Sequence, residues 1–408
     1  MKKILFLMGR YFPKASPNTL CVQNIIDSIS KEENEVYVLC YEDYLKDEVH
    51  SKNVTKLSRG LLHSSIYKNE DKKGKTAALK KKCLHYVLMG RQLLTYSQWP
   101  LTDPLFTKKE LCIAKKIVEK EKIDIVVAVH FPLSSLIVAS QLKNIYPHIK
   151  YYSYFLDSLS GGSVPKLISK SRFDRQAEAW ERKVTQNADK IIFMEASREY
   201  HSKLYAGSEQ EKHIEYLDLP MLREQKVKKY SKKVTTEFVY IGSLASSIRS
   251  PEFFLRVFES SENTSWRLTF VGDDSCDAVN NAAKKDARIK VVGRCPHEEA
   301  LQYEEGADIL LNFGNNNPNL TPSKIFEYMS WGKKIISTYP IENESSLQYL
   351  RRYPKALLLN ERETNLSKTV EMIEAFTNQE DRTIEYSELA EIFKKNTPEA
   401  FVELLDQN

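Results

Sequence analysis

The amino-acid sequence predicts an α/β protein built from two tandem, doubly wound Rossmann-like domains that face each other across a cleft. Short apolar segments alternate with helical segments through most of the 408 residues, a rhythm typical of parallel sheets covered by helices on both faces. At roughly 100–200 residues per domain, the length fits two or three domains. A polar, basic connector at residues 226–233 separates two such series, as is typical of a domain boundary. We therefore expect domains at residues 1–222 and 236–385, and a C-terminal helix within 386–408 that packs back on the first domain.

In the first series, each expected strand is a short apolar run. The strands fall at residues 3–8, 35–40, 123–129, 150–155 and 190–194. The helices fall at residues 18–31, 108–121, 133–143 and 171–187. Asn18 suits the N-cap of the first helix, because its side chain can accept a hydrogen bond from an unpaired backbone N–H. Apolar positions 22, 25, 26 and 29 of this helix would share one buried face.

The second series repeats the pattern. Its expected strands fall at residues 237–241, 266–271, 289–292, 309–312 and 334–337. Its expected helices fall at residues 251–259, 277–284, 297–305 and 323–331, and the chain from residue 341 reads as mainly helical. Open parallel sheets bind ligands at the carboxyl ends of their strands. We therefore expect the ligand where the carboxyl ends of the two sheets face each other.

Composition narrows the class of protein. Hydrophobic residues are 42% and charged residues 28% of the chain, which is ordinary globular usage and excludes a disordered or fibrous chain. The longest apolar runs fall short of the ~20 residues that cross a bilayer, and the N-terminus reads as a buried strand instead of a signal peptide. Six scattered cysteines and eight histidines show no disulfide or metal-ligand spacing. We expect a cytoplasmic protein with no metal and no other cofactor.

Positive charge is concentrated in one stretch. Residues 52–91 contain eleven lysines and arginines but only two acidic residues, within a net charge of +5. Residues 84–94 are apolar with basic flanks, and such a helix can lie on anionic lipid at the inner face of the cell membrane. A solvated insertion folded over the core is the alternative. No nucleic-acid-binding motif accompanies the charge, so nucleic acid is not an expected partner.

Several strands of the second series end in glycine or polar turns. These turns are Gly242-Ser243, Gly272-Asp273-Asp274 and Gly293-Arg294, and Thr321-Pro322-Ser323-Lys324 opens a later helix. Glycine lets a ligand approach the backbone closely, and N–H groups at a helix start bind phosphate oxygens. Arg249 and Lys324 add two cations at helix starts. Two cations with two helix starts suit a diphosphate.

These segments resemble a known family. Residues 238–243, 270–272, 292–294 and 322–333 (Pro-Ser-Lys-Ile-Phe-Glu-Tyr-Met-Ser-Trp-Gly-Lys) are similar, in this order, to the donor-binding domain of GT-B-fold glycosyltransferases of glycosyltransferase family 4, also called glycosyl transferases group 1. The segments 11–13, 129–130 and 187–192 resemble the acceptor domain of that family. The resemblance covers nearly the whole chain, and residues 323–332 are its most specific block.

The resemblance implies roles for residues of the second domain. Glu327 matches a glutamate whose carboxylate accepts hydrogen bonds from both ribose hydroxyls, which a carboxylate can do at once. Asn319 stands where the family has a first glutamate that meets the transferred sugar, so the sequence departs from the pattern there. Arg249 and Lys324 would stabilise charge on the departing diphosphate without a metal. The other implied nucleotide-binding residues are Gly242, Ser243, Gly272, Gly293, Arg294, Asn319, Thr321 and Ser323.

It also implies roles in the first domain. His130, at a strand end, matches a histidine near the transferred sugar, although a lone histidine there could equally be a hydrogen-bonded loop residue. Asp157 follows another strand and would contact the acceptor or the sugar. Residues 16–18 replace a glycine pair near the diphosphate, where Asn18 and Thr19 could still donate hydrogen bonds from a helix start.

The function that follows is an expectation. The resemblance implies a metal-independent, retaining hexosyltransferase that uses a UDP- or GDP-sugar. A lipid-linked or polysaccharide precursor of bacterial surface glycan synthesis is the expected acceptor. A nucleotide-sugar epimerase of the same fold, and a non-catalytic nucleotide-sugar-binding partner of a transferase, are the alternatives; the residue at 319 keeps the second of these open.

Overall fold

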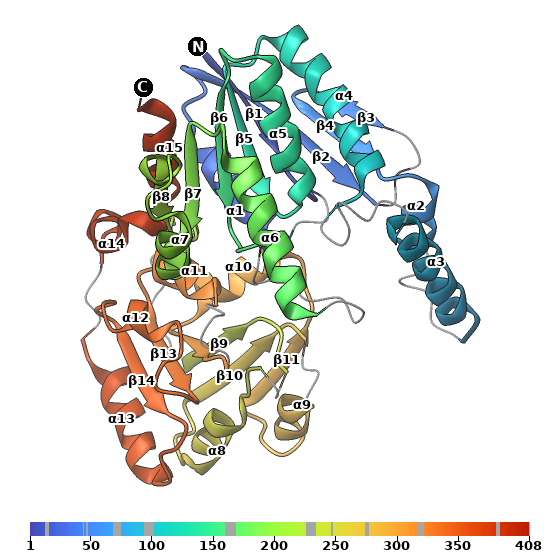
Figure 1. Ribbon diagram of the computed structural model, residues 1–408. Coiled ribbons are helices and arrows are strands. Elements are labelled where there is room, and N and C mark those ends of the chain that lie inside the picture. Colours follow the sequence, from blue (N-terminus) through green and yellow to red (C-terminus); the bar gives the residue numbers. More distant parts are fainter. Residues whose placement is uncertain are drawn as a thin grey trace. The chain divides into compact units, whose positions relative to one another are not determined.

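A computed structural model describes residues 1–408 except 13–15, 44, 46–47, 68–74, 94–101, 160–168, 226–233, 246–247, 274–276, 317–321, 381–383 and 408. The chain forms two compact units (Figure 1). Unit 1 is Met1–Pro220 together with Pro398–Asn408, and unit 2 is Met221–Thr397.

These bounds differ from the expected ones at the C-terminus. Residues 386–397 belong to unit 2, because they hold the start of that unit in place. The Tyr386 hydroxyl donates to the Leu222 carbonyl oxygen at 3.3 Å, and the Leu222 N–H donates to the Asn396 carbonyl oxygen at 3.0 Å. Only the last helix, α15 (Pro398–Asp406), belongs to unit 1, where it packs on α1 (Pro17–Ser28).

The described part of unit 1 contains an eight-stranded sheet. In spatial order its strands are β3 (Val49–Ser51), β4 (Val54–Ser58), β2 (Asn34–Glu42), β1 (Lys2–Leu7), β5 (Ile125–His130), β6 (Lys150–Phe155), β7 (Lys190–Met194) and β8 (Ile214–Leu217). Neighbouring strands are parallel, apart from the antiparallel pair β3 and β4. The winding direction reverses between β1 and β5, which makes their carboxyl ends the switch point of this sheet.

Helices connect these strands. Besides α1 and α15 they are α2 (Leu61–Tyr67), α3 (Lys75–Leu93), α4 (Pro104–Glu121), α5 (Leu133–Ile145), α6 (Lys170–Thr185) and α7 (Arg198–Tyr205), with short 3₁₀ turns at Glu195–Ser197 and Glu211–His213. The hairpin of β3 and β4, the helices α2 and α7, and the strand β8 were not expected. Their strands are three to five residues long and largely half-exposed, so no long apolar run marks them.

The described part of unit 2 contains a six-stranded, fully parallel sheet. Its order is β11 (Ile289–Gly293), β10 (Trp266–Val271), β9 (Thr236–Ile241), β12 (Ile309–Phe313), β13 (Lys334–Tyr339) and β14 (Ala356–Asn360). The switch point lies between β9 and β12. The strand β14 shows that the expectation of a mainly helical segment after residue 341 was wrong in part.

The helices of unit 2 follow its strands in alternation. They are α8 (Glu252–Ser260), α9 (Ala278–Ala283), α10 (His297–Gly306), α11 (Lys324–Ser330), α12 (Leu347–Leu350), α13 (Leu366–Asn378) and α14 (Tyr386–Ile392), followed by a 3₁₀ turn at Lys394–Asn396. Large aromatic side chains fill the core: Phe238, Phe254, Phe258 and Trp266 are each at most 1% exposed. Such burial is the main stabilising contribution that this unit has.

The start of α1 differs from the expectation. Ser16, not Asn18, is the N-cap: its hydroxyl accepts from the Thr19 N–H at 3.2 Å, and the Thr19 hydroxyl accepts from the Ser16 N–H at 2.9 Å. Pro17 fits the first helical position, because its missing N–H needs no partner there. The reciprocal bonds form a capping box. They engage the hydroxyl of Thr19, one of the two residues that could donate hydrogen bonds from this helix start.

We predict that Phe401→Ala destabilises unit 1 by about 3–5 kcal/mol, the usual range for emptying a buried phenylalanine site. Phe401 is fully buried in α15, and its ring centre lies 4.8 Å from that of Tyr154 in β6. The conservative change Phe401→Leu should lose less than about 1.5 kcal/mol. Denaturant unfolding measures both, and equal losses would show that α15 is not part of the core of unit 1.

Candidate functional site

Three glycine turns pack together at the carboxyl edge of the unit 2 sheet. Gly242 follows β9, Gly272 follows β10, and Gly293 ends β11. The Gly242 N–H donates to the Val271 carbonyl oxygen at 2.9 Å, and the Gly272 N–H donates to the Gly293 carbonyl oxygen at 2.8 Å. A Cβ on Gly272, whose φ is +135°, would lie 1.9 Å from the Gly242 carbonyl oxygen. Only glycine fits there, because the loops after β9 and β10 pack backbone against backbone.

Arg249 lies at the switch point of the same sheet. Its Nε and Nη2 donate to Asn315 Oδ1 at 3.1 and 3.0 Å, and its Nη1 donates to the Tyr240 hydroxyl at 3.3 Å. The Tyr240 hydroxyl in turn donates to the Ser243 carbonyl oxygen at 3.2 Å. Arg249 is therefore held between the loop after β9 and the loop after β12, close to the expected binding residue Ser243.

A buried glutamate, Glu344, holds the loop residue Asn315 that contacts Arg249. Glu344 is 2% exposed; its Oε1 accepts from the Asn315 N–H at 3.3 Å and its Oε2 from the Ser346 N–H at 3.0 Å. A Cβ on Gly314 would lie 2.9 Å from the Glu344 Cγ, so this loop sits directly on the carboxylate. Glu344 fixes Asn315, and Asn315 orients Arg249. Sequence analysis did not predict that these two residues support Arg249.

Lys324 and Glu327 lie one turn apart at the start of α11. Lys324 Nζ is 2.7 Å from Glu327 Oε2 and 2.9 Å from Glu304 Oε1, which comes from α10. Glu304 is fully buried, and its Oε2 accepts from the Trp331 indole N–H at 2.8 Å. The ammonium thus lies between two carboxylates, of which only Glu327 was expected.

Burial and charge set the protonation of this group. Burial, with the nearby Glu327 carboxylate, raises the pKa of Glu304. Burial alone would lower the pKa of Lys324, but the two carboxylates outweigh it and hold that pKa above its usual value. Lys324 is therefore positively charged at neutral pH. Glu327 is 4% exposed, and among the described residues its Oε1 has no hydrogen-bond partner.

Other expected residues contribute less or lie outside the described part. Arg294 is exposed and pairs with Asp273 at 2.7 Å. Ser323 precedes α11 but makes no capping hydrogen bond, and α11 has only seven residues. A helix this short has a weak N-terminal dipole, so Lys324, not the helix start, is the positive feature here. Asn319 and Thr321 lie outside the described residues.

In unit 1, His130 ends β5 at the switch point. It is 5% exposed, and its Nδ1 lies 2.8 Å from the Asp157 carbonyl oxygen. A carbonyl oxygen can only accept, so Nδ1 carries the proton and Nε2 is the acceptor nitrogen. Burial lowers the pKa of His130 to about 4, so the ring is neutral at pH 7. Any hydrogen-bond partner of Nε2 must then be a donor.

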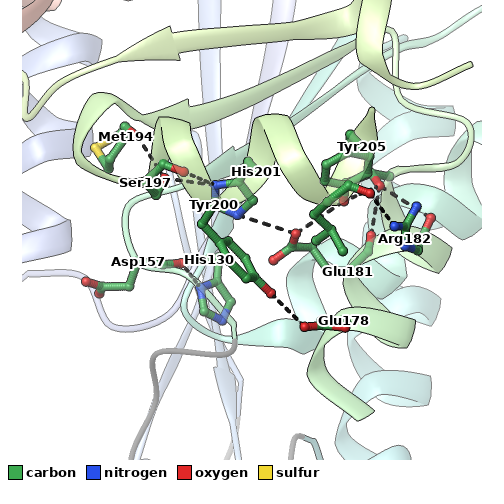
Figure 2. A network of polar contacts seen from close by, with 12 residues as sticks. His130, Asp157, Glu178, Glu181, Arg182, Met194, Ser197, Tyr200, His201 and Tyr205 are labelled. Carbon is green, nitrogen blue, oxygen red and sulfur yellow. Dashed lines mark hydrogen bonds and ion pairs between the residues drawn. The ribbon is translucent and has the colours of Figure 1, made fainter. Parts of the chain in front are cut away.

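Asp157 contributes its backbone to this contact. Figure 2 shows the His130 ring directed at the Asp157 carbonyl group, whereas the exposed Asp157 carboxylate points away from the ring. Asn18 also contacts this site, since its side-chain amide donates to the His130 carbonyl oxygen at 3.4 Å. The two expected first-domain residues are therefore brought together, but through the main chain of Asp157.

A second polar network connects residues of α6 and α7 (Figure 2). The His201 ring stacks on Phe193, with ring centres 3.5 Å apart, and its Nδ1 lies 2.9 Å from the Ser197 hydroxyl. Its Nε2 is 3.4 Å from Glu181 Oε1, which also accepts from the Tyr205 hydroxyl at 3.3 Å. His201 and Glu181 are at most 1% exposed, so this network joins α6 to α7 in the interior of unit 1.

Comparison with known proteins agrees on the fold. No protein-family model and no curated protein sequence matches this chain. Among solved structures, HepE of Anabaena in complex with UDP has a TM-score of 0.60 and 12% identity, covering 100% of both chains.

Two further structures are similar over nearly their whole length. The E. coli trehalose-6-phosphate protein bound with UDP-2-fluoro glucose has a TM-score of 0.58 and 10% identity, covering 100% of this chain and 99% of that one. The lipopolysaccharide outer core galactosyltransferase WaaB, in its apo form, has a TM-score of 0.52 and 14% identity, covering 99% of both. At these identities the likeness establishes the architecture: the chain has the GT-B fold, with two parallel-sheet α/β units.

The environment of His130 predicts a pH dependence of stability. Its folded pKa of about 4 lies below the ordinary 6.5, so the unfolded chain binds the proton first as the pH falls. The unfolding free energy should therefore decrease between pH 6.5 and pH 4, by up to about 3 kcal/mol from this residue. His130→Asn, which keeps a donor for Asp157, should lack this component. If the unfolding free energies of the wild type and the variant decreased equally between pH 6.5 and pH 4, the lowered pKa of His130 would be contradicted.

Proposed function

We propose that this protein is a glycosyltransferase that moves a hexose from a uridine diphosphate sugar to an acceptor. The proposal rests on Glu327 Oε1, which has no hydrogen-bond partner among the described residues and lies 3.9 Å from His297 Nε2, while Lys324 anchors the other oxygen of this buried carboxylate. A buried acceptor without a donor is destabilising, and a ribose hydroxyl would supply that donor. Uridine is proposed as the base because HepE and the E. coli trehalose-6-phosphate protein were solved with UDP or a UDP-sugar.

The reaction would depend on positive charge held in place before the substrate arrives. Arg249 is held by hydrogen bonds to Asn315 and Tyr240. Lys324 is held by the carboxylates of Glu304 and Glu327. Cations in fixed positions stabilise negative charge that develops on a leaving diphosphate, without reorganisation during the reaction. We place the chain with the family 4 enzymes that its 322–333 segment resembles, and we expect transfer with retention and without a metal.

In unit 1, His130 is proposed to position the sugar substrate. Its neutral ring holds the proton on Nδ1, so Nε2 can accept a hydrogen bond from a sugar hydroxyl. Because the pKa is about 4, the imidazole is not a proton donor at neutral pH. Its role would be orientation and not acid catalysis.

The helix α3 supports a lipid-linked acceptor and a peripheral position on the cytoplasmic face of a membrane. Leu79, Tyr86 and Val87 are 65%, 57% and 60% exposed, and their spacing places them on one helical face. Exposed Lys80 and Lys82 flank that face. Among the described helices none is both long and apolar enough to cross a bilayer. An exposed apolar face with lysines at its borders suits a helix lying in the surface of an anionic membrane.

The first test concerns the nucleotide site. Glu327→Ala should weaken UDP binding by about 10–100-fold, the worth of a hydrogen bond to a buried charged group. Isothermal titration calorimetry measures the affinity, and Glu298→Gln, an exposed change on α10, is the matched control. Equal UDP affinity in the wild type and Glu327→Ala would overturn the ribose assignment.

The second test concerns the leaving group. The variant Lys324→Met is combined with Glu304→Gln, so that Glu304 is not left as a second buried carboxylate without its partner. This double variant should lower kcat at least about 100-fold, with a smaller effect on KM. Single-turnover transfer from radiolabelled UDP-hexoses to a membrane lipid fraction provides the rate. Release of free, epimerised sugar without an acceptor would identify an epimerase instead. Tight UDP binding without turnover would identify a non-catalytic binding protein.

The third test concerns the membrane. Replacing Lys80 and Lys82 with Gln should weaken binding to phosphatidylglycerol vesicles by about fivefold per lysine, and Leu79→Ser with Val87→Ser should weaken it further. Leu105→Ser, an equally exposed apolar residue on α4, is the control. Co-sedimentation measures binding, and equal pelleting with neutral phosphatidylcholine vesicles would contradict the electrostatic part of the proposal.

A further inference from the structure

Two arginines meet at one carboxylate on the carboxyl edge of the unit 1 sheet. Arg10 lies just after β1, Asp43 directly after β2, and Arg59 directly after β4. The strands β4, β2 and β1 are parallel neighbours, so these three loops share one edge. Such edges are where open parallel sheets bind ligands. We call Arg10, Asp43 and Arg59 the arginine cluster.

The contacts within the cluster are short. Arg10 donates through Nε and Nη2 to Asp43 Oδ2 at 3.1 and 2.6 Å. Arg59 Nη1 lies 3.2 Å from the other oxygen, Asp43 Oδ1. The Asp43 side chain is 8% exposed, whereas those of Arg10 and Arg59 are 45% and 26% exposed. The carboxylate is thus the buried base of the cluster, and the side chains of both arginines are partly exposed to solvent.

Arg59 is fixed by two further neighbours. Its guanidinium lies over the Tyr41 ring, 4.7 Å from the centre, and its Nη2 is 2.8 Å from His63 Nε2. His63 Nδ1 lies 3.1 Å from the Arg59 carbonyl oxygen, so Nδ1 carries the proton and Nε2 accepts from the guanidinium. Burial, with the nearby Arg59 charge, lowers the pKa of His63 to about 4. His63 is therefore neutral, and Arg59 is held rigidly without losing its charge.

The charges around the cluster do not cancel. Lys56 pairs with Glu42 at 3.0 Å, and Lys109 pairs with Glu48 at 3.3 Å. Within the described part of the chain, the two members of each pair neutralise each other, and the two guanidinium groups share direct contact with the single carboxylate of Asp43.

The neighbouring helix α4 brings two more acids: Asp103 at its N-cap, whose charge acts on His63, and Glu110. Burial raises the pKa of that carboxyl to about 7, so it is only partly ionised at neutral pH. In direct contact, the two guanidinium groups therefore outnumber the one carboxylate that they share, a local excess that a bound anion would balance.

We propose that the arginine cluster binds the phosphate or diphosphate group of the acceptor. Planar guanidinium forks match phosphate oxygens in a two-point geometry, and orienting them beforehand reduces the entropy lost on binding. Binding of the anion stands on the cluster alone, and its identification as the acceptor rests on the proposed glycosyl transfer. The helix α2, which carries His63, packs against α3. A lipid diphosphate bound at the cluster would therefore lie in the same unit as the helix proposed to rest on the membrane.

The test is calorimetric titration of the full chain with inorganic pyrophosphate. Saturating UDP is present throughout, so that the nucleotide site is blocked. Arg10→Gln and Arg59→Gln should each weaken pyrophosphate binding at least about tenfold, since each removes charge-assisted hydrogen bonds. Arg59→Lys should fall in between, because it keeps the charge and loses the fork. Lys203→Gln, which removes an exposed cation from α7, should change nothing.

The outcomes separate the hypotheses. Unchanged pyrophosphate affinity in Arg10→Gln, or no binding by the wild type, overturns the phosphate site. Arg10 is nearly half exposed, so this variant decides the question even if Arg59→Gln fails to fold. Geranyl diphosphate distinguishes the source: tighter binding than pyrophosphate indicates a lipid headgroup, and equal binding indicates a soluble phosphate. Loss of UDP binding with an intact pyrophosphate site would refute the proposed transferase and leave the phosphate site standing.

Discussion

The parallel arrangement of both sheets is the constraint on which the rest of the structure depends. Parallel strands are buried on both faces, so the loops at their carboxyl ends are where polar side chains of different strands can meet a ligand. In unit 2, the order β10-β9-β12 brings the loops after β9 and β12 together, and the contact between Arg249 and Asn315 follows from that order. In unit 1 the same geometry joins the loops after β1, β2 and β4. Strand order, more than local sequence, decides which side chains meet.

The sequence predicted the fold where the signal was a continuous apolar run. The two-domain α/β architecture and the central strands appear as expected, because buried parallel strands have few alternatives. The strand β14 was missed, since a run of four apolar residues fits a short helix as well as a strand. The N-cap of α1 was misplaced because Ser16 and Asn18 are both good caps, and only the reciprocal bonds with Thr19 distinguish them.

The site could be predicted only as far as local spacing reaches. Lys324 and Glu327 are one helical turn apart, so their contact follows from the sequence. Glu304, twenty residues before Lys324, looks in sequence like an exposed residue of a charged helix. Its burial becomes visible only when α10 is placed beside α11. The protonation of His130 likewise depends on burial and on a main-chain carbonyl group, which a sequence motif does not encode.

The shared ammonium of Lys324 links nucleotide binding to proton exchange. A bound diphosphate that attracted this ammonium would draw it away from Glu304. The Glu304 carboxyl group is fully buried and bonded to Trp331. It would then lie beside the Glu327 carboxylate with less positive charge to compensate it. Such a group takes up a proton from solvent. The heat of UDP binding should then vary with the ionisation enthalpy of the buffer. Titrations in phosphate-free buffers of low and high ionisation enthalpy would give the number of protons taken up, and identical heats would show that Lys324 does not move.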